Sequence, residues 1–406
     1  MTSLIHLTLL LVSAGLKIVS AQEFGVDELL RSSISRFNYP VELHPVETID
    51  GYKLMMARIP APGKPILFCM HSFLSSSAEY TVFGPKKSLA FLASEAGFDV
   101  WLGNGRGNTF SRAHRTIDPN QRKFWSFSFH EAGVYDLPAM IDYTLNVTQK
   151  QQLHYVGHSQ GSVNFLVLTS MLPQYNSRIA SAHLSAPVAF WSQNTLPFRL
   201  IDDQLIEVLH LLDDAGYCEV FGRSDDEFYE RLSATIKGGG SVTKNLFFQG
   251  LWMIIGKDEK GFNQSSLDSI MEFFPAGASI RQALHFTQTY KTETFSQYDF
   301  GKTENMKRYG RASPPEYPLQ NIVAPVALYY GLNDPLVAVE DLELLAEELP
   351  NQMKMQNSNQ PAAAAVDGTN IATCYKVISP ADSFGYRPST NASSNRIQII
   401  HGGHLQ

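Results

Sequence analysis

The sequence predicts an α/β fold in which a mostly parallel central sheet carries helices on both faces and a helical cap is inserted into it. Between residues 53 and 334, short apolar runs alternate with longer helical patterns. Strands that alternate with helices form largely parallel sheets with covered faces. After residue 196 an aromatic-rich helical pattern interrupts the alternation. The 406 residues are 44% hydrophobic and 11% aromatic, which is enough for a large core or a wide apolar pocket.

The strands of this sheet are predicted from short apolar runs that turn-forming residues separate. Such runs are typical of strands buried on both faces. Residues 132–145 and 162–168 carry helical patterns between them. The predicted strands are residues 65–70, 98–102, 153–156, 179–184 and 326–330, with 396–400 as a last strand.

Residues 197–317 are predicted to form the helical cap or lid. Apolar residues from Leu205 to Leu212 recur at helical spacing, and Gly238–Gly240 provides a hinge. Most of the aromatic side chains in this stretch are expected to pack the cap itself. The stretch includes Phe247, Phe248, Trp252, Phe273, Phe274, Phe286 and Tyr290.

Residues 351–395 differ in composition from the rest of the chain. Asn, Gln, Ser and a run of alanines dominate there, which predicts a mobile polar insertion at the surface. The α/β core is then expected to consist of residues 22–196 and 318–406, divided by the cap. The length of 406 residues is therefore expected to correspond to one core with insertions and not to a row of separate domains.

Residues 1–21 are predicted to be a secretory signal peptide. Leu4–Val12 form a nearly unbroken apolar run that is too short to span a bilayer. The small residues Val19, Ser20 and Ala21 suit cleavage after Ala21. No later stretch reaches ~18 consecutive apolar residues, so no transmembrane segment is expected in the mature chain.

Glycosylation sequons begin at Asn146, Asn263 and Asn391. A single sequon is a weak signal, but sequons behind a signal peptide support transit through the secretory pathway. The sequence therefore predicts a glycoprotein that is secreted or lysosomal.

The composition excludes several classes of protein. With 32 basic and 39 acidic residues, the net charge is -7, which argues against nucleic acid as a partner. Three cysteines cannot form a disulfide scaffold. Cys69 falls in an apolar strand and is expected to be a buried thiol, and the pairing of Cys218 and Cys374 stays open. No His/Cys cluster has metal-ligand spacing, so neither a metal nor a cofactor is expected.

The sharpest chemical motif is the G-x-S-x-G at residues 157–161 (GHSQG). It lies between a predicted strand and a predicted helix, which is the context that a nucleophilic serine requires. Glycines at 157 and 161 allow the tight turn on which Ser159 would project. The amides at the start of the following helix would face a developing oxyanion.

A serine hydroxyl needs a base, and the base needs an orienting carboxylate. In this fold the chain order is Ser, then Asp or Glu, then His. Asp334 follows the predicted strand at 326–330 and is preferred to Glu340 and Asp341, which fall in the next helical pattern. Only His401 and His404 come later, and His404 is the preferred base. Earlier histidines such as His154, His158 and His183 precede Asp334 and would break the order.

The oxyanion hole requires two backbone donors. One is the amide after the nucleophile, which belongs to Gln160. The other comes from the loop after an early strand. Because this loop follows residues 65–70, Phe73 is the predicted second donor.

Taken together, these segments resemble the acid lipases, the family of lysosomal acid lipase, gastric lipase and secreted insect lipases. The resemblance covers most of the chain from about Tyr39 to Asn351. Asp334 matches the family's acid position, and His404-Leu405 fits its His-Leu pair. The segments that carry it are residues 100–112 (VWLGNGRGNTFSR), 135–139 (YDLPA), 153–161 (LHYVGHSQG), 275–279 (PAGAS) and 298–301 (YDFG).

The resemblance implies an α/β-hydrolase core, a helical cap over the active site and an activity in lipid degradation. It implies hydrolysis of acylglycerols, cholesteryl esters or related lipid esters through an acyl-serine intermediate. The expected partners are a lipid ester and the surface of a droplet or micelle. An aromatic-rich insertion over a serine also suits a long acyl chain.

The sequence departs from the family pattern at three places, one of which is the stretch at 351–395 that lengthens the interval between the acid strand and the histidine. Ser72 stands where the family usually has Gly beside the oxyanion donor, so a positive φ there would strain the loop. Two residues follow His404, whereas the family continues. Two alternatives stay open, and the departures motivate the first of them. One is a catalytically impaired, lipase-like lipid-binding protein, and the other is a hydrolase of the same fold that acts on peptides.

Overall fold

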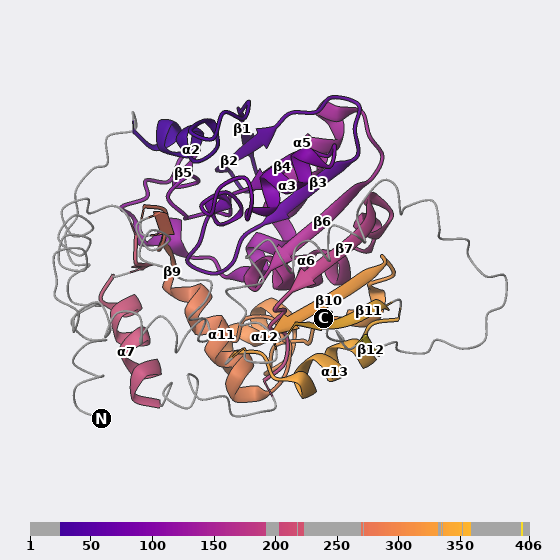
Figure 1. Ribbon diagram of the computed structural model, residues 1–406. Coiled ribbons are helices and arrows are strands. Elements are labelled where there is room, and N and C mark those ends of the chain that lie inside the picture. The colour runs from indigo at the N-terminus through magenta and orange to yellow at the C-terminus, as the bar shows by residue number, and fades with distance from the viewer. Residues whose placement is uncertain are drawn as a thin grey trace, which may run out of the picture.

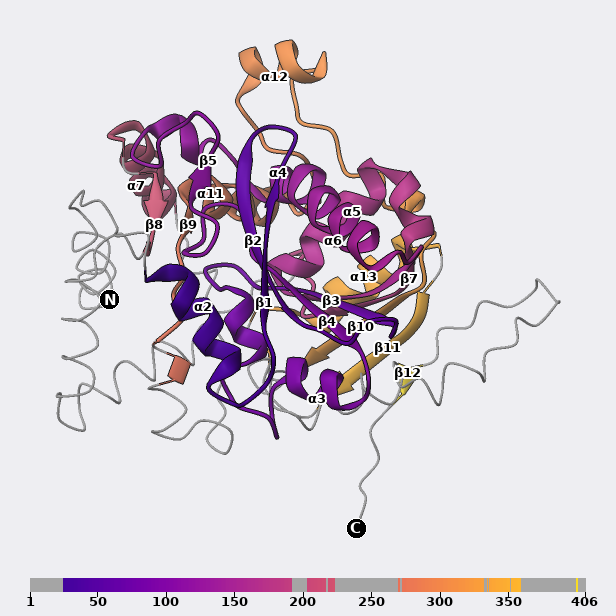
Figure 2. The same ribbon diagram turned by 90° about the horizontal axis from the view of Figure 1, so that it is seen from above.

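A central sheet crosses the molecule, with helices packed on both sides of it (Figures 1 and 2). The computed structural model describes residues 25–191, 203–216, 218–222, 269–270, 272–331, 334 and 336–350, and the backbone of the strands at 352–358 and 399–400.

The strand order of the sheet is β1-β2-β4-β3-β6-β7-β10-β11-β12, with β5 beside β2. From β4 to β12 all neighbours are parallel, whereas β1, β2 and β5 pair in antiparallel fashion at one side. The strands are β1 (Glu42–Glu47), β2 (Tyr52–Ile59), β3 (Ile66–Met70), β4 (Asp99–Gly103), β5 (Ala113–His114), β6 (Leu153–His158), β7 (Ile179–Ser185), β10 (Val326–Gly331), β11 (Gln352–Ser358) and β12 (Ile399–Ile400). The predicted mostly parallel α/β fold is confirmed.

Two cores, one on each face of the sheet, result from the alternation of side chains along the strands. In β3 the side chains of Ile66, Phe68 and Met70 belong to one core. Leu67 and Cys69 belong to the other. All of these residues are buried, which explains why the strand has an unbroken apolar sequence. Cys69 is the buried thiol that the sequence predicts.

The helices cover both cores, as Figure 2 shows. Leu30 of α2 (Val26–Ser35) and Phe91 of α3 (Leu89–Glu95) pack in one core. The other core includes Met140, Phe165 and Leu342. These three residues come from α5 (Leu137–Thr148), α6 (Gln160–Met171) and α13 (Val339–Glu348). Shorter helical segments are η1 (Ser77–Tyr80), η2 (Arg122–Trp125), α4 (Phe129–Glu131), the π-helical η3 (Ala132–Asp136), η4 (Pro173–Arg178) and η6 (Leu319–Asn321).

Each predicted strand is present within two residues of its expected ends, apart from the last strand. Of that strand the structure describes Ile399–Ile400, and residues 396–398 lie outside the described residues. The antiparallel pair β1 and β2 was not predicted, because β1 is mostly exposed or half-buried and the apolar run in β2 is limited to residues 54–57.

The first part of the predicted polar insertion at 351–395 forms a strand. Gln352–Ser358 is β11, which pairs in parallel with β10 and with β12. Its sequence, QMKMQNS, is mostly polar, and methionines alternate with polar residues. The polar composition of this segment therefore did not indicate a strand. Close to the edge of a sheet, one face of a strand need not be apolar. The rest of the insertion lies outside the described residues.

The described part of the predicted cap, 197–317, is mainly helical. It contains α7 (Asp203–Asp214), α11 (Ile280–Thr292) and α12 (Lys302–Tyr309), besides the short pair β8 (Glu219–Val220) and β9 (Ala278–Ser279). Ile206 of α7 packs with Ile280 and Leu284 of α11. Phe286 and Tyr290 on α11 instead pack against the core that contains Met140 and Phe165. Helix α11 therefore connects the cap to that core. The Gly238–Gly240 hinge and the aromatics from Phe247 to Trp252 lie outside the described residues, and the cap's bounds stay a prediction.

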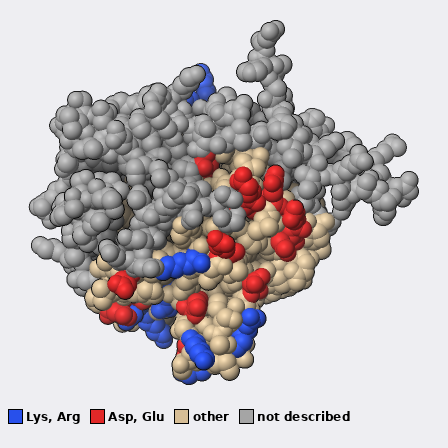
Figure 3. All heavy atoms as spheres, turned by 90° about the horizontal axis from the view of Figure 1, so that it is seen from below, with Lys and Arg blue, Asp and Glu red and all other residues tan. Residues whose placement is uncertain are grey.

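Within the described ranges, no helix has the length and apolar character needed to cross a bilayer. The predicted signal peptide at 1–21 lies outside those ranges. On the face in Figure 3, acidic side chains gather over part of the described surface. The outer side of α13 contributes such a surface, because Glu340, Glu343, Glu347 and Glu348 are all exposed there.

Candidate active site

Ser159 occupies the turn between β6 and α6. Its backbone has φ 50° and ψ -112°, a conformation that is sparsely populated for a residue with a side chain. The amide of Ser159 donates a hydrogen bond to the carbonyl oxygen of Ser185 at 2.8 Å. This bond ties the turn to the end of β7.

The flanking glycines permit this turn because no side chain fits at either position. A Cβ on Gly161 would lie 2.1 Å from the carbonyl oxygen of Met70. A Cβ on Gly157 would lie 2.6 Å from the amide nitrogen of Ser162. Real Cβ atoms do not approach backbone atoms so closely, which is the steric reason expected from the motif. The start of α6 therefore packs directly on the end of β3.

The carboxyl ends of three adjacent parallel strands bring Ser159 and Asp334 to one edge of the sheet. His158 of β6 is in register with Ser185 of β7, and Ser185 is in register with Tyr329 of β10. Asp334 follows the end of β10, and its amide donates to the carbonyl oxygen of Gly331 at 3.1 Å. The structure thus brings together two of the residues that the sequence predicts for catalysis.

The carboxylate of Asp334 has one used and one unused oxygen. Its Oδ1 accepts a hydrogen bond from the amide of Leu336 at 2.9 Å. Its Oδ2 is buried and accepts none from the described residues. Burial raises the pKa of Asp334 to about 6. A buried carboxylate with a spare acceptor is suited to hold the N–H of an imidazole.

The predicted base, His404, and its alternative, His401, both lie outside the described residues. The strand before them, β12, runs parallel to β11 and ends at Ile400. Its carboxyl end therefore faces the same edge of the sheet as those of β6 and β10.

Two of the earlier histidines are engaged within the sheet. His154 Nδ1 lies 2.8 Å from Ser181 Oγ, and His183 Nδ1 lies 2.9 Å from Tyr329 Oη. Ser181 Oγ also lies 3.0 Å from His183 Nε2, so one hydrogen-bonded chain links β6, β7 and β10. These contacts agree with the exclusion of both histidines as the base.

The loop after β3 carries the predicted oxyanion donor Phe73. No described residue accepts a hydrogen bond from the Phe73 amide. As the first residue of α6, Gln160 has an amide without an acceptor inside the helix. The left-handed residue of this loop is Leu74, with φ 60°, and not Ser72. The strain that was expected at Ser72 therefore does not arise there.

A buried polar cluster beside the Ser159 turn was missed by sequence reasoning. Glu79 of η1 accepts hydrogen bonds from the amide and the hydroxyl of Ser72, at 3.2 and 2.8 Å. Its Oε1 lies 3.5 Å from Nδ1 of His158. His71 Nδ1 donates to the carbonyl oxygen of Ser72 at 2.8 Å, and its Nε2 accepts from the amide of Gly105 at 3.0 Å. The signal in the sequence was a lone acid among small residues at 75–80, and it carried no periodicity.

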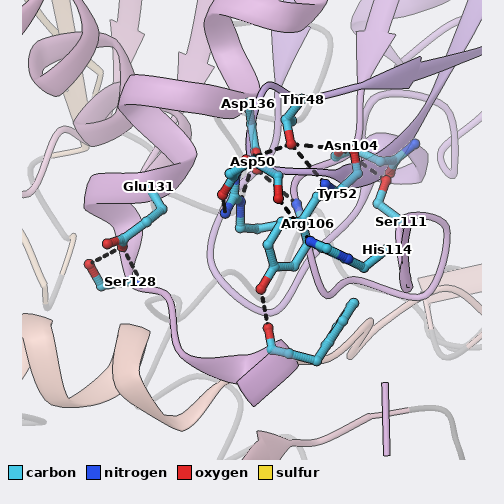
Figure 4. Close-up of polar contacts among 11 residues, drawn as sticks. Thr48, Asp50, Tyr52, Asn104, Arg106, Ser111, His114, Ser128, Glu131 and Asp136 are labelled. Atoms are coloured by element: carbon cyan, nitrogen blue, oxygen red, sulfur yellow. Dashed lines mark hydrogen bonds and ion pairs between the residues drawn. The ribbon is translucent and has the colours of Figure 1, made fainter. Parts of the chain in front are cut away.

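The loop after β4 is held by a buried ion-pair network (Figure 4). Arg106 Nε donates to Asp136 at 2.7 Å, and a terminal nitrogen of Arg106 donates to Asp50 at 2.7 Å. The guanidinium also lies 4.0 Å from the centre of the Tyr52 ring. Gly105 and Asn108 of this loop contact His71. The network therefore holds in place the loop on which the polar cluster packs.

A chain of aromatic ring contacts connects the loop after β3 to α11. The half-buried ring of Phe73 meets Phe286 edge-on, with centroids 5.7 Å apart. Phe286 lies 4.9 Å from Phe129, which stacks on His285 at 3.7 Å. The predicted oxyanion loop therefore touches an apolar wall.

Other predicted sites show a mixed outcome. Asn146 is exposed near the end of α5, as a glycosylated residue must be. Asn263 and Asn391 lie outside the described residues. Among the residues that the structure describes, no His, Cys, Asp and Glu side chains group as metal ligands do.

Comparison with known proteins gives consistent matches. The model of the alpha/beta hydrolase fold matches residues 65–359, and that of the partial alpha/beta-hydrolase lipase region matches residues 30–84. Lipase 3 of Drosophila melanogaster is 38% identical over 86% of this chain and 89% of its own. Human gastric triacylglycerol lipase is 36% identical, and human lysosomal acid lipase/cholesteryl ester hydrolase is 35% identical. Both of these alignments cover 78% of this chain and 81% of the relative.

Among solved structures, a bacterial membrane phospholipase A is similar in fold, with a TM-score of 0.50. It is 15% identical in sequence, and the match covers 93% of this chain and 97% of that one. At this identity the likeness concerns the fold alone.

Proposed function

The chain belongs to the lipases of the alpha/beta-hydrolase fold, and from this premise we propose that it is a serine lipase of the secretory pathway. As a member of that family it is a carboxylic ester hydrolase. One observation carries the proposal of a serine mechanism. Ser159 lies on a strained turn at the sheet edge where buried Asp334 has one carboxylate oxygen that accepts no hydrogen bond from the described residues.

In the proposed reaction, Ser159 Oγ attacks the ester carbonyl carbon while a histidine takes the hydroxyl proton. We assign His404 to this role and Asp334 to the orientation of its imidazole. The carbonyl π electrons move onto the oxygen, and the tetrahedral intermediate collapses by expelling the alcohol, which takes the proton from His404. A water molecule then attacks the acyl-serine in the same way, releasing the fatty acid and restoring Ser159.

The oxyanion is proposed to bind the amides of Phe73 and Gln160. Each such donor typically contributes about 3–4 kcal/mol to the transition state. Two features support this assignment. The Phe73 amide has no acceptor among the described residues, and the Gln160 amide begins α6, where the helix dipole favours negative charge.

The proposed substrates are acylglycerols or cholesteryl esters, presented at the surface of a lipid droplet or micelle. The half-buried ring of Phe73, which packs against Phe286 of α11, supports an apolar acyl chain beside the proposed nucleophile. Gastric triacylglycerol lipase and lysosomal acid lipase/cholesteryl ester hydrolase, by their names, act on these two ester classes. The signal peptide expected at 1–21 and the exposed Asn146 support a secreted or lysosomal glycoprotein.

Replacing the nucleophile tests the proposal. The secreted chain and its Ser159→Ala variant are assayed with p-nitrophenyl esters of several acyl lengths between pH 4 and pH 9. Ser159→Ala is expected to lower kcat by about 10⁶-fold, because the step that forms the acyl-enzyme is lost. Ser177→Ala, an exposed serine on η4, is the matched control and is expected to keep full activity.

Wild-type turnover no greater than that of Ser159→Ala would instead support a lipase-like lipid-binding protein. Hydrolysis of short acyl chains only would make the protein an esterase. His401→Ala and His404→Ala, measured side by side, separate the two possible bases. Only the variant that removes the base should approach the rate of Ser159→Ala.

A further inference from the structure

We propose that Glu79 is a positioning residue for the oxyanion hole, holding the Phe73 loop through Ser72 and balancing its charge against His158. The inference rests on the proposed serine mechanism and adds a residue to it. Glu79 itself touches neither the nucleophile nor, by this assignment, the substrate.

The carboxylate of Glu79 accepts hydrogen bonds from Ser72, the residue immediately before the proposed donor Phe73. Ser72 donates both its amide and its hydroxyl to Glu79 Oε2, at 3.2 and 2.8 Å. The Ser72 amide also lies 3.3 Å from Oε1. Fixing this amide fixes the orientation of the chain that leads into Phe73. An oxyanion donor is effective only when its direction is set before the reaction.

The element that carries Glu79 is itself rigidly held. The amide of Ser77 donates to Asn104 Oδ1 at 2.9 Å, and Tyr80 Oη donates to the carbonyl oxygen of Met70 at 2.8 Å. These bonds anchor η1 on both sides of Glu79. The carboxylate is therefore aimed at Ser72 by the scaffold and not by a flexible side chain alone.

His158 supplies the charge that makes a carboxylate tolerable at this place. The Glu79 side chain is only 11% exposed, and an unpaired negative charge near a developing oxyanion would oppose the reaction. His158 Nδ1 lies 3.5 Å from Glu79 Oε1. Because His158 directly precedes Ser159, the pair also joins the Phe73 loop to the nucleophile turn.

The protonation states of the cluster agree with this arrangement. Burial alone would lower the pKa of His158, but Glu79 and Asp334 raise it above its usual value. Burial alone would raise the pKa of Glu79, but His158, His71 and Ser72 hold it below its usual range. Burial lowers the pKa of His71, which therefore stays neutral and donates to the Ser72 carbonyl oxygen.

The pair also predicts a pH dependence. The groups that face it are His71, Ser72 and Asp334, besides Tyr80 of the same element, whose burial raises its pKa well above the usual value. His158 is therefore the facing group expected to lose its proton first as pH rises from neutral. Above its pKa, Glu79 remains charged without a counter-ion, so kcat should fall toward alkaline pH.

The test compares Glu79→Ala and Glu79→Gln in the full secreted chain, with p-nitrophenyl butyrate as substrate. Glu79→Ala is expected to lower kcat by about 10- to 100-fold and to change KM by less than about twofold, because an oxyanion donor acts on the transition state. Glu79→Gln keeps an acceptor for Ser72 and should recover part of kcat. Since Gln carries no charge, its kcat should not fall with the deprotonation of His158.

Glu304→Gln, on the exposed helix α12, is the control and should show the wild-type kcat and pH profile. The inference is overturned if folded Glu79→Ala retains kcat within twofold of wild type. It is also overturned if Glu79→Gln and wild type show superimposable pH profiles, a comparison that holds even if Glu79→Ala does not fold. If the role of Glu79 is purely structural, its variants should show changed melting temperatures but the wild-type pH profile of kcat.

The Ser159→Ala measurement separates this inference from the proposed function. If wild type turns over the ester and Ser159→Ala does not, the serine mechanism stands and only the role of Glu79 is at stake. If wild type does not turn over any ester, the serine mechanism and the inference fall together.

Discussion

The residue that most constrains the active-site turn is Gly161. Its Cα lies so close to β3 that a methyl group would meet the carbonyl oxygen of Met70 at 2.1 Å. This contact explains in steric terms why the motif requires glycine there, and the requirement could be read from the sequence. The partner atom could not, because Met70 lies 91 positions earlier and meets Gly161 only through the pairing of β3 with β6.

Gly161→Ala is accordingly expected to destabilise the protein by at least about 2 kcal/mol, since a backbone contact must yield. It should also reduce kcat, because Ser159 must shift with the turn. Urea unfolding and the p-nitrophenyl butyrate assay measure the two effects. Gly25→Ala, where a Cβ meets nothing within 4 Å, serves as control. Equal stability of the two variants would contradict the assigned contact.

At the scale of the element, the loop after β4 is ordered by charge in the protein interior. Arg106 is 3% exposed and Asp136 is fully buried, and their ion pair links this loop to the η3 turn. Sequence reasoning singled out residues 100–112 as a signature by resemblance alone. The physical reason appears only in the structure. Asp50 precedes Arg106 in the chain and Asp136 follows it, and only the fold brings both carboxylates to the guanidinium.

Arg106→Ala is expected to cost about 3–5 kcal/mol of unfolding free energy, because Asp136 would remain buried without its partner. Arg178→Ala provides the matched comparison, since Arg178 pairs with Asp142 at the surface, where side-chain exposures are 41% and 48%. An exposed pair is worth at most about 1 kcal/mol. Similar losses in urea unfolding for the two variants would show that the buried pair has no special weight.

Among the strands, composition predicts some elements correctly and misses others. β3, β4 and β6 were predicted because both of their faces are buried and their sequences are apolar. β11 was assigned to a polar insertion, because an edge-proximal strand needs few apolar residues. What made it a strand was the free edge of β10, which is a tertiary feature.

For the whole molecule, the buried histidines predict how stability depends on pH. Burial lowers the pKa of His183 and of His285 to about 3. The folded state therefore resists protonation that the unfolded chain accepts below about 6.5. Stability is present above that pH and falls as pH decreases toward 3. The raised pKa values of His158 and Asp334 act in the opposite direction.

His183→Asn tests this effect. Each such histidine contributes a slope of at most about 1.4 kcal/mol per pH unit below 6.5. The loss of unfolding free energy between pH 7 and pH 5 should therefore be smaller in the variant, by about 1–2 kcal/mol. His210→Asn, an exposed residue on α7, should leave the slope unchanged. Urea unfolding at both pH values is the measurement, and parallel pH curves for wild type and His183→Asn would refute the assignment.

The sequence by itself determined the fold class and pointed to Ser159 and Asp334 as the proposed nucleophile and acid. Local rules suffice for these: apolar runs set the parallel strands, G-x-S-x-G requires a tight turn, and chain order points from Ser159 to Asp334. The tertiary structure decided what depends on distant contacts. Only folding brings Glu79 to Ser72 and His158, buries the carboxylate of Asp334, and adds β11 to the sheet. Burial and charge balance arise from neighbours in space, which no local pattern encodes.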